Sequence, residues 1–374
     1  MDGVKVAEIP QIEVDPVTLD IIEGALKSAR FEMDAVLFRS AMSPVIREQH
    51  DEFPMITDPR GRMVVGQFGA YINEMMEDWD RGIYPGDVIL TSDPFKCSAS
   101  ISHTNDWLVL VPIFFEDEIV GWSSQFGHQM DAGGRLPGSL PTGATTIFEE
   151  GLIIPPLKIV ERGEVQEDIL RLILNNVRLP QMNRADLFAI VAGCRAGEKR
   201  VIELCERFGK DVYLAALQAL LDRTHEAMRK LIQLAIPEEP QTFEDWIDDD
   251  GLGNGPYKMK LTIWREGDHA FFDKSLEAIN PNVAVVLVIL GDDLDQLVLP
   301  DVMPAAFDRL KYLEGETDRL TNRSALGESA LPSGLGAGAR LALAMVVMLL
   351  GRPVLVQVEV AEARCEEERV TRLD

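Results

Sequence analysis

The order of apolar and polar residues predicts a long amphipathic helix near the start of the chain. Between Asp15 and about Ser40, apolar side chains recur mostly at intervals of three and four residues, which places them on one face of a helix. Asp15 followed by Pro16 is typical of a helix N-terminus, because the carboxylate can accept a hydrogen bond from an unpaired backbone N–H and proline suits the first helical position. We therefore expect this helix to pack one apolar stripe against a core.

Two pairs of strands are expected next. Residues 53–57 and 63–68 are expected to form a hairpin around 58–61, where the sequence Asp-Pro-Arg-Gly suits a type I turn. Residues 107–115 and 119–124 flank a short acidic turn. The first strand of this second pair is almost continuously apolar, which is typical of a strand covered on both faces. The second hairpin is therefore predicted to lie inside a sheet rather than at its edge.

Helical periodicity replaces the strand pattern further along the chain. Residues 137–156 contain four prolines and three glycines, which indicates a long loop of the kind that often carries function. Apolar residues then recur at helical spacing over 168–235, with one helix expected to open near Asp186 and another to cover 214–232. This order favours a mixed α+β fold, in which a hairpin-rich N-terminal sheet region and a following helical region form one core over residues 1–235.

A change of composition separates this core from a second β region. Residues 236–256 collect proline, glycine and acidic residues, which favours a linker. Apolar and polar residues alternate over 257–264, so a second β region is expected to start over 257–273.

Composition excludes several classes of function. The chain has 374 residues with 36 Lys+Arg and 62 Asp+Glu, a net charge of −26, so it lacks the basic surface that nucleic-acid binding requires. Its longest apolar stretch, 341–350, is well short of the roughly 20 residues that span a bilayer. The four cysteines form no paired motif, and the N-terminus lacks the apolar core of an export signal. We therefore expect a cytoplasmic protein with buried, reduced thiols and no membrane segment.

Three stretches superficially suggest nucleotide or calcium binding but do not fit it. Residues 193–199 have three residues between their glycines and a Glu before the Lys, whereas a phosphate-binding loop has four residues there and Lys directly after the second glycine. They also lie within a helical pattern, which indicates a helix with surface charge and close packing. Residues 334–338 lack the final glycine spacing of a dinucleotide fold, and the acidic residues of 248–251 are consecutive rather than alternating. No nucleotide site is therefore expected on this chain.

The histidines carry the strongest chemical signal. Only five are present, and two of them belong to the pattern His-x-x-Asp: His103 with Asp106, and His128 with Asp131. One copy leads into the first strand of the second hairpin and the other follows its second strand. Because an antiparallel pair joined by a short turn brings its outer ends together, we expect the two copies to meet.

The two copies together would form a metal-binding donor set. Two imidazoles with one or two carboxylates suit Zn, Mn or Fe(II) and leave positions open for water or substrate. Asp51, just ahead of the first hairpin, is a further candidate ligand. The alternative is that the spacing arises by chance, with each His satisfied in the core and each Asp capping a turn. Spacing alone leaves both interpretations open.

Further motifs follow one another over residues 14–273. They are Ile46-Arg47-Glu48 with Asp51, 85–95, His103 with Asp106, 127–134, 137–139, 147–156, 176–178, 197–200 and 248–251. Together they resemble the hydantoinase B / 5-oxoprolinase family, which includes the metal-bearing subunits of ATP-dependent ketone carboxylases.

The resemblance implies a divalent metal, Zn, Mn or Fe, held by two His and one or more Asp. The ligands would be His103, Asp106 and His128, with Asp51 as a candidate fourth. Asp131 would orient a ligand histidine or move a proton as a catalytic residue.

The resemblance also implies a hetero-oligomer in which ATP is bound by a separate hydantoinase A-type ATPase subunit. The partner would phosphorylate an amide or enol oxygen of a small-molecule substrate, and this chain would supply the metal. The leading interpretation is a subunit of a hydrolase that opens hydantoin- or 5-oxoproline-like cyclic amides. The alternatives are a subunit of an acetone- or acetophenone-type ketone carboxylase and a truncated, non-catalytic assembly subunit.

Beyond residue 273 the resemblance stops. Residues 274–374 lack the Gly-rich continuation of the family, so they are expected to be a divergent or frameshifted tail. The other two reading frames of the coding DNA would test this, because a frameshift predicts family-like sequence there.

Overall fold

The chain folds into two compact units. The computed structural model describes residues 5–66, 72, 75, 79–97, 101, 103–248, 256–278, 283–287 and 358–362. Among them, residues up to 230 belong to the first unit and those from 231 onward to the second. The boundary between the units lies inside one continuous helix, five residues before the predicted end of the core at residue 235. Helical periodicity predicts that a helix forms there, but it does not show which unit the helix packs against.

The helices of the described chain lie in the predicted helical regions, apart from a short helix at 44–47 that was not predicted. They are α1 (Pro16–Ser40), α2 (Pro44–Arg47), α4 (Glu167–Leu174), α5 (Pro180–Phe208) and α6 (Lys210–Ala235), with short 3-10 turns η1 (Pro94–Lys96) and η2 (Ile147–Glu149). At the start of α1, the Asp15 carboxylate accepts a hydrogen bond from the Thr18 N–H at 3.0 Å, as predicted. No helix of the described chain combines the length and hydrophobicity needed to cross a membrane.

The start of α5 differs from the prediction. The helix begins at Pro180, six residues before Asp186, because proline is well suited to the first helical turn. Asp186 is buried and does not cap its own helix. Its carboxylate instead accepts hydrogen bonds from the backbone N–H groups of Met42 (2.6 Å) and Ser43 (3.1 Å), which anchors the connection between α1 and α2.

A seven-stranded antiparallel sheet forms the centre of the first unit. Its strands are β1 (Glu52–Thr57), β2 (Met63–Val65), β3 (Val88–Thr91), β4 (Asp106–Phe115), β5 (Glu118–His128), β6 (Leu157–Glu161) and β7 (Glu164–Val165). They lie in the order β2-β1-β5-β4-β3-β6-β7. Both predicted hairpins are present, and β4–β5 lies in the interior of the sheet as its apolar pattern indicated. Helices together with antiparallel sheets confirm the α+β class.

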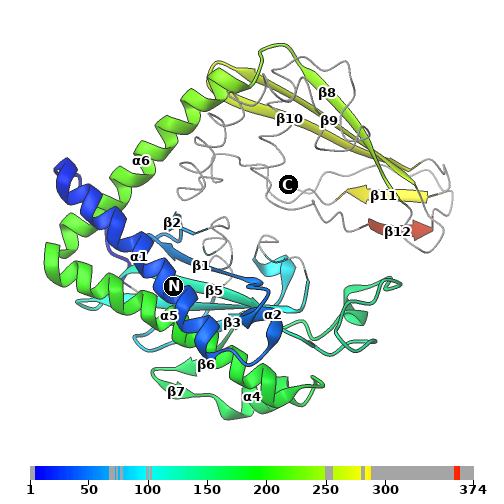
Figure 1. Ribbon diagram of the computed structural model, residues 1–374, viewed down its shortest axis with the longest axis horizontal. Coiled ribbons are helices and arrows are strands. Elements are labelled where there is room, and N and C mark those ends of the chain that lie inside the picture. Colours follow the sequence, from blue (N-terminus) through cyan, green and yellow to red (C-terminus); the bar gives the residue numbers. More distant parts are fainter. Residues whose placement is uncertain are drawn as a thin grey trace. The chain divides into compact units, whose positions relative to one another are not determined.

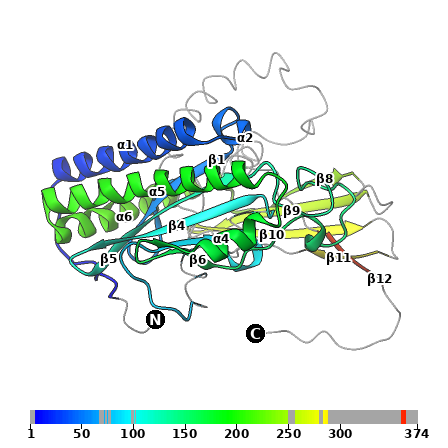
Figure 2. The ribbon, with the colours of Figure 1, turned by 90° about the horizontal axis from the view of Figure 1, so that it is seen from below.

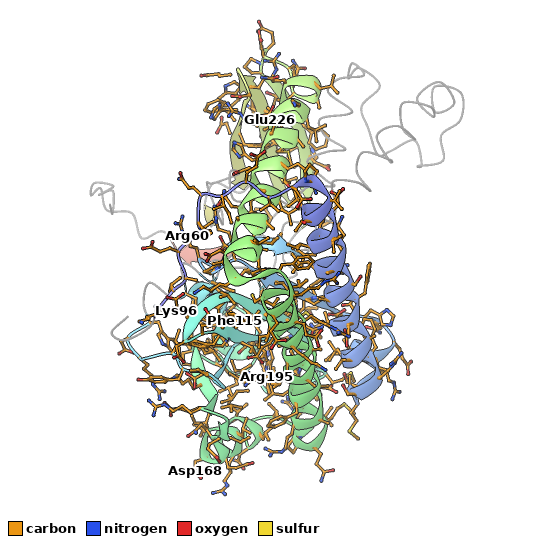
Figure 3. The ribbon with its side chains drawn as sticks, turned by 90° about the vertical axis from the view of Figure 1, so that its left-hand side faces the viewer. Arg60, Lys96, Phe115, Asp168, Arg195 and Glu226 are labelled. Atoms are coloured by element: carbon orange, nitrogen blue, oxygen red, sulfur yellow. The ribbon has the colours of Figure 1, made fainter. Side chains whose placement is uncertain are left out.

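Helices α1 and α5 form a layer on one face of this sheet (Figures 1 and 2). The approach of α5 is close: a Cβ added at Gly193 would overlap the side chain of Gln125, and one at Gly197 would overlap Ser123. Arg195 donates a hydrogen bond to the Gly86 carbonyl at 2.7 Å and lies on α5 in Figure 3. The stretch 193–199 is therefore part of a packed helix, as predicted.

The second unit contains a three-stranded antiparallel sheet and a separate strand pair. The sheet has the order β10-β9-β8, with β8 (Gln241–Ile247), β9 (Tyr257–Glu266) and β10 (His269–Ala278). The pair is β11 (Val283–Leu287) with β12 (Val358–Glu362).

Strand β8 corrects the prediction of a linker over 236–256. Residues 241–247 pair with β9 along their full length, and the hydroxyls of Thr242 and Thr262 lie 3.0 Å apart across the two strands. Composition predicted a linker because it takes no account of pairing with a strand further along the chain. Strand β10 likewise continues to Ala278, past the predicted start of the tail at residue 274. Apart from this end of β10 and the pair β11–β12, the expected tail lies outside the described residues.

The described cysteines are buried thiols, as expected. Cys97, Cys194 and Cys205 are all buried and take part in no disulfide. Burial raises the pKa of Cys194 far above its usual range and that of Cys205 to about 12. Neither Cys194 nor Cys205 is therefore a reactive thiolate at neutral pH. Cys365 lies outside the described residues.

Candidate metal centre

The central hairpin brings two histidines and an aspartate together at its open end. Asp106 is the first residue of β4 and His128 is the last residue of β5, and the two are direct partners in the antiparallel register. His103 returns to the same place through a tight turn, in which the Asp106 N–H donates to the His103 carbonyl at 3.2 Å. The predicted convergence therefore occurs for His103, Asp106 and His128.

Three potential ligand atoms face one another in this cluster. His103 Nε2 lies 3.1 Å from His128 Nδ1, and Asp106 Oδ1 lies 3.2 Å from the first and 3.0 Å from the second. Hydrogen bonds alone would need a shared proton in each of these three close pairs. Two protons cannot supply all three pairs, and two ring nitrogens that both carry a proton would repel each other. Donor atoms about 2.1 Å from one ion and at right angles to each other are about 3.0 Å apart. The triangle thus has the size that one divalent cation requires.

Asp106 has the electrostatic character of a metal ligand. Burial alone would raise its pKa, but hydrogen bonds from His103 and His128 outweigh burial and lower the pKa to about 2, so the group is an anion at neutral pH. Its second oxygen, Oδ2, is buried without a hydrogen-bond partner among the described residues. A buried carboxylate oxygen without a partner is costly unless a cation compensates it. The side chains present therefore fit a divalent metal.

Asp51 stands at the border of the cluster. Its Oδ2 lies 3.7 Å from His128 Nδ1, and its side chain is 41% exposed. The His128 N–H donates to the Asp51 carbonyl at 3.1 Å, which ties this loop to the end of β5. The preceding His50 has a left-handed backbone, with φ of 55°, and its ring stacks on Phe38 at 3.9 Å. Asp51 is thus within a small side-chain movement of the three convergent atoms.

Asp131 does not join the cluster. Its Oδ1 accepts hydrogen bonds from the Gly133 N–H (2.9 Å) and its Oδ2 from the Gly138 N–H (3.0 Å), while the Arg178 guanidinium contacts both oxygens. Burial opposes its ionisation, but these amide and guanidinium donors outweigh burial and lower its pKa. The geometry favours a positioning role for this carboxylate over proton transfer.

Arg178 holds the loop that follows β5 in one conformation. Besides Asp131, its guanidinium donates to the carbonyl oxygens of Gly133 (2.9 Å), Gly134 (2.7 Å) and Leu136 (3.1 Å). We name residues 131–139 the Arg178 loop. Asn105, between His103 and Asp106, donates to the Gly138 carbonyl at 3.2 Å, so the Arg178 loop is also tied to the candidate ligands.

Replacing Arg178 with lysine is expected to loosen the Arg178 loop. An ammonium group cannot reproduce the planar set of donors that reaches one carboxylate and three carbonyls, so the free energy of unfolding should fall by about 2 kcal/mol. Hydrogen exchange of the amides of residues 133 and 138 should accelerate. The control is Arg171→Lys on α4, because its partner Asp168 lies at the outer surface, so that variant should match the wild type (Figure 3). Unchanged exchange in Arg178→Lys would contradict this role.

Two further carboxyl groups near the site escaped the sequence analysis. Glu52 is buried beside Asp34, which lies on α1. Glu150 lies in the loop after η2, where burial raises its pKa and the charge of His103 opposes that rise. Nothing in local periodicity identifies either residue, because both acquire their surroundings from segments far away in the sequence.

Comparison with known proteins places the chain in a family. The model of the family described as Hydantoinase B/oxoprolinase matches residues 15–282, so the chain belongs to this family. The match continues nine residues past the predicted limit at residue 273, into the second unit.

Two relatives and one solved structure show what the chain is similar to. The chain is 32% identical over 266 residues to the caprolactamase subunit beta of Pseudomonas jessenii, covering 69% of this chain and 45% of the relative. It is 30% identical over 274 residues to the 5-oxoprolinase of Dictyostelium discoideum, covering 70% of this chain and 21% of the relative. The crystal structure of the ATP-dependent caprolactamase from Pseudomonas jessenii superposes with a TM-score of 0.63 at 30% identity, covering 70% of this chain and 46% of that chain. The chain thus spans less than half the length of these relatives.

Proposed function

We propose that this chain is the metal-bearing subunit of an ATP-dependent hydrolase that opens cyclic amides of the hydantoin or 5-oxoproline type. His103, Asp106 and His128 would hold the metal, with Asp51 completing the site, and Zn or Mn suits the donor set. The observation that carries the proposal is the convergence of three potential ligand atoms within 3.2 Å of one another, beside a carboxylate oxygen that is buried without a partner.

The bound metal would supply a Lewis acid that polarises the carbonyl group of the substrate. The work of this chain's residues is to orient the substrate and to move protons. Asp131 would act by holding the Arg178 loop beside the ligands. The proposal of an ATPase partner is supported by two observations on relatives: caprolactamase is named as ATP-dependent, and its matching chain is named as a subunit. An ATP-consuming partner and buried thiols support a cytoplasmic location.

The test is reconstitution with a hydantoinase A-type ATPase subunit. Purified chain is loaded with Zn or Mn, mixed with the partner and ATP, and offered 5-oxoproline, hydantoin, caprolactam and 2-pyrrolidinone. We expect ring opening of at least one cyclic amide, about one bound metal per chain, and loss of both in His103→Ala. Bicarbonate-dependent consumption of acetone or acetophenone instead would favour a ketone carboxylase. Full turnover by the His103→Ala complex would favour a non-catalytic assembly subunit.

A further inference from the structure

Helix α1 has a second apolar face, opposite the face that packs on the core. The buried residues of the helix are Ile22, Leu26, Ala29, Met33 and Leu37. An exposed stripe follows steps of four and three residues on the other side; we name it the α1 stripe, and it consists of Val17, Ile21, Gly24, Ser28 and Phe31. Val17, Ile21 and Phe31 are 67%, 42% and 63% exposed. A helix that is apolar on two opposite faces is suited to packing between two bodies, and the described chain supplies a body on one face only.

Large side chains occupy both ends of the α1 stripe and small ones its middle. Gly24 and Ser28 are about one helical turn apart, and a Cβ added at Gly24 would meet no atom within 4 Å. Two helices that cross at an angle are closest at the crossing point and diverge on either side of it. Ile21 and Phe31, which flank the small residues, can fill the widening space. The shape of the stripe therefore suits a second helix that crosses α1 near Gly24 and Ser28.

The charged residues beside the α1 stripe compensate one another. Every acidic side chain of α1 has a basic partner, and the pairs are Asp20 with Arg223 (3.6 Å), Glu23 with Lys27 (2.9 Å), Glu32 with Arg200 (2.5 Å) and Asp34 with Arg30 (3.8 Å). The surface around the stripe is therefore close to neutral, although the whole chain has a net charge of −26. Copies of so acidic a protein repel one another over most of their surface, and this repulsion is small at α1.

The charges that remain uncompensated lie at the two ends of α1 and have opposite signs. Glu13 and Asp15 are exposed where the helix begins, and Arg39 is exposed in its last turn. None of the three forms an ion pair with another residue of the described chain. A second copy of α1 that runs antiparallel to the first would bring Arg39 of each copy beside the acidic end of the other. The ends of α1 are thus complementary to the ends of an antiparallel copy.

One antiparallel register satisfies both the shape and the charges. When Ser28 of one copy lies opposite Gly24 of the other, Phe31 lies opposite Ile21 on each side of the crossing point. The same register places the basic end of each helix opposite Glu13 of the other copy. The antiparallel arrangement also sets the N-terminus of each helix beside the C-terminus of its neighbour, which is favourable for the two helix dipoles.

We propose that the α1 stripe is the contact surface between two copies of this chain, which pair antiparallel about a two-fold axis near Gly24 and Ser28. Such an interface is self-complementary, so each contact occurs twice. A second copy is favoured over an unrelated partner because the same helix supplies the matching small residues, the flanking apolar residues and the charges of opposite sign. The pairing depends neither on a bound metal nor on the proposed function.

The first experiment measures the molar mass of the full chain by sedimentation equilibrium over a range of protein concentrations. We expect a dimer, and Phe31→Glu should raise its dissociation constant by about 100-fold, because each copy contributes one buried charge to the interface. The matched control is Leu172→Glu on α4, where the side chain is 68% exposed and lies away from α1, and its dimer should match that of the wild type. His103→Ala should dimerise normally as well. Circular dichroism verifies that every variant is folded.

Two further variants test the antiparallel register. Arg39→Glu and Glu13→Arg should each weaken the dimer by about 3- to 10-fold, and the double variant should restore it, because the exchanged charges face each other again. Under mild oxidation, Gly24→Cys mixed with Ser28→Cys should form a disulfide-linked dimer, whereas each variant alone should not. The wild type under the same conditions controls for the native thiols.

Several results would overturn the proposal. One is a chain that remains monomeric at every concentration, and another is a dimer that Phe31→Glu leaves unchanged. Cross-linking by Gly24→Cys alone would overturn the antiparallel register, because a parallel pair places the two Gly24 positions opposite each other. Loss of binding to a hydantoinase A-type subunit in Phe31→Glu, with self-association unchanged, would assign the α1 stripe to that partner instead.

Discussion

Replacement of Asp106 by asparagine is expected to weaken divalent metal binding by more than about 100-fold. Loss of a group that merely orients a metal ligand costs 10- to 100-fold in affinity, and Asp106 is itself positioned as a ligand. Its Oδ1 lies within 3.2 Å of both imidazole nitrogens, and its charge is the buried anion of the cluster. Asparagine keeps the shape and one carbonyl oxygen but loses that charge. Competition with a chelating indicator, with elemental analysis of the dialysed protein, measures the change.

Asp51→Asn provides the matched comparison for this prediction. The side chain is 41% exposed and stands 3.7 Å from His128 Nδ1, so its removal should weaken binding less than Asp106→Asn does. Circular dichroism and urea unfolding of the metal-free proteins would show that both variants keep the fold. Equal affinity of Asp106→Asn and wild type would refute the assignment of Asp106 as a ligand.

The three central residues of the site were accessible to sequence reasoning because one hairpin places them. A tight acidic turn fixes the pairing of β4 with β5, and antiparallel geometry then determines that Asp106 faces His128. His103 follows because only two residues separate it from the start of β4. No knowledge of the remaining fold was needed, since every step was local to residues 103–128.

The role of Asp131 could not be inferred in the same way. The spacing that it shares with Asp106 suggested a similar environment, but its partner Arg178 lies 47 residues further along the chain. Local spacing determines where a side chain can reach, whereas a competing long-range donor determines where it points. The same reason explains β8, whose composition resembles a linker and whose partner strand lies beyond it in the sequence.

Long-range contacts also bring together two carboxyl groups, one at the start of β1 and one on α1. Glu52 opens β1 and Asp34 lies on α1, and these elements meet only because the helix covers the sheet. Gln125 on β5 donates a hydrogen bond to Glu52 at 2.7 Å. Burial raises the pKa of Glu52 to about 8, with the charge of Asp34 adding to the effect. Burial raises the pKa of Asp34 as well, although Arg30 opposes that rise. The pair therefore retains a proton at neutral pH.

Glu52→Gln is expected to remove a loss of stability that the wild type suffers as the pH rises. An unfolded Glu releases its proton near its usual pKa of 4.5, whereas native Glu52 holds it to about 8. Between these values the native state binds more protons than the unfolded state, so the free energy of unfolding falls with rising pH. Glutamine imitates the protonated form, since its amide can donate to Asp34 while its oxygen accepts from Gln125. At pH 9 the variant should exceed the wild type by a few kcal/mol, and at pH 5 the two should nearly agree.

Urea unfolding of metal-free protein at several pH values between 5 and 9 measures this effect. The difference between variant and wild type isolates Glu52, because the other titrating groups contribute to both curves. Glu164→Gln, which removes one exposed negative charge from β7, should give a difference that does not vary with pH. Asp34→Asn should also flatten the profile, since Asp34 is the charge that adds to burial in raising the pKa of Glu52. A pH-independent difference for Glu52→Gln would mean that Glu52 is ionised in the native state. In that case, the negative charge of the pair would be compensated by Arg30 on α1 rather than by a shared proton.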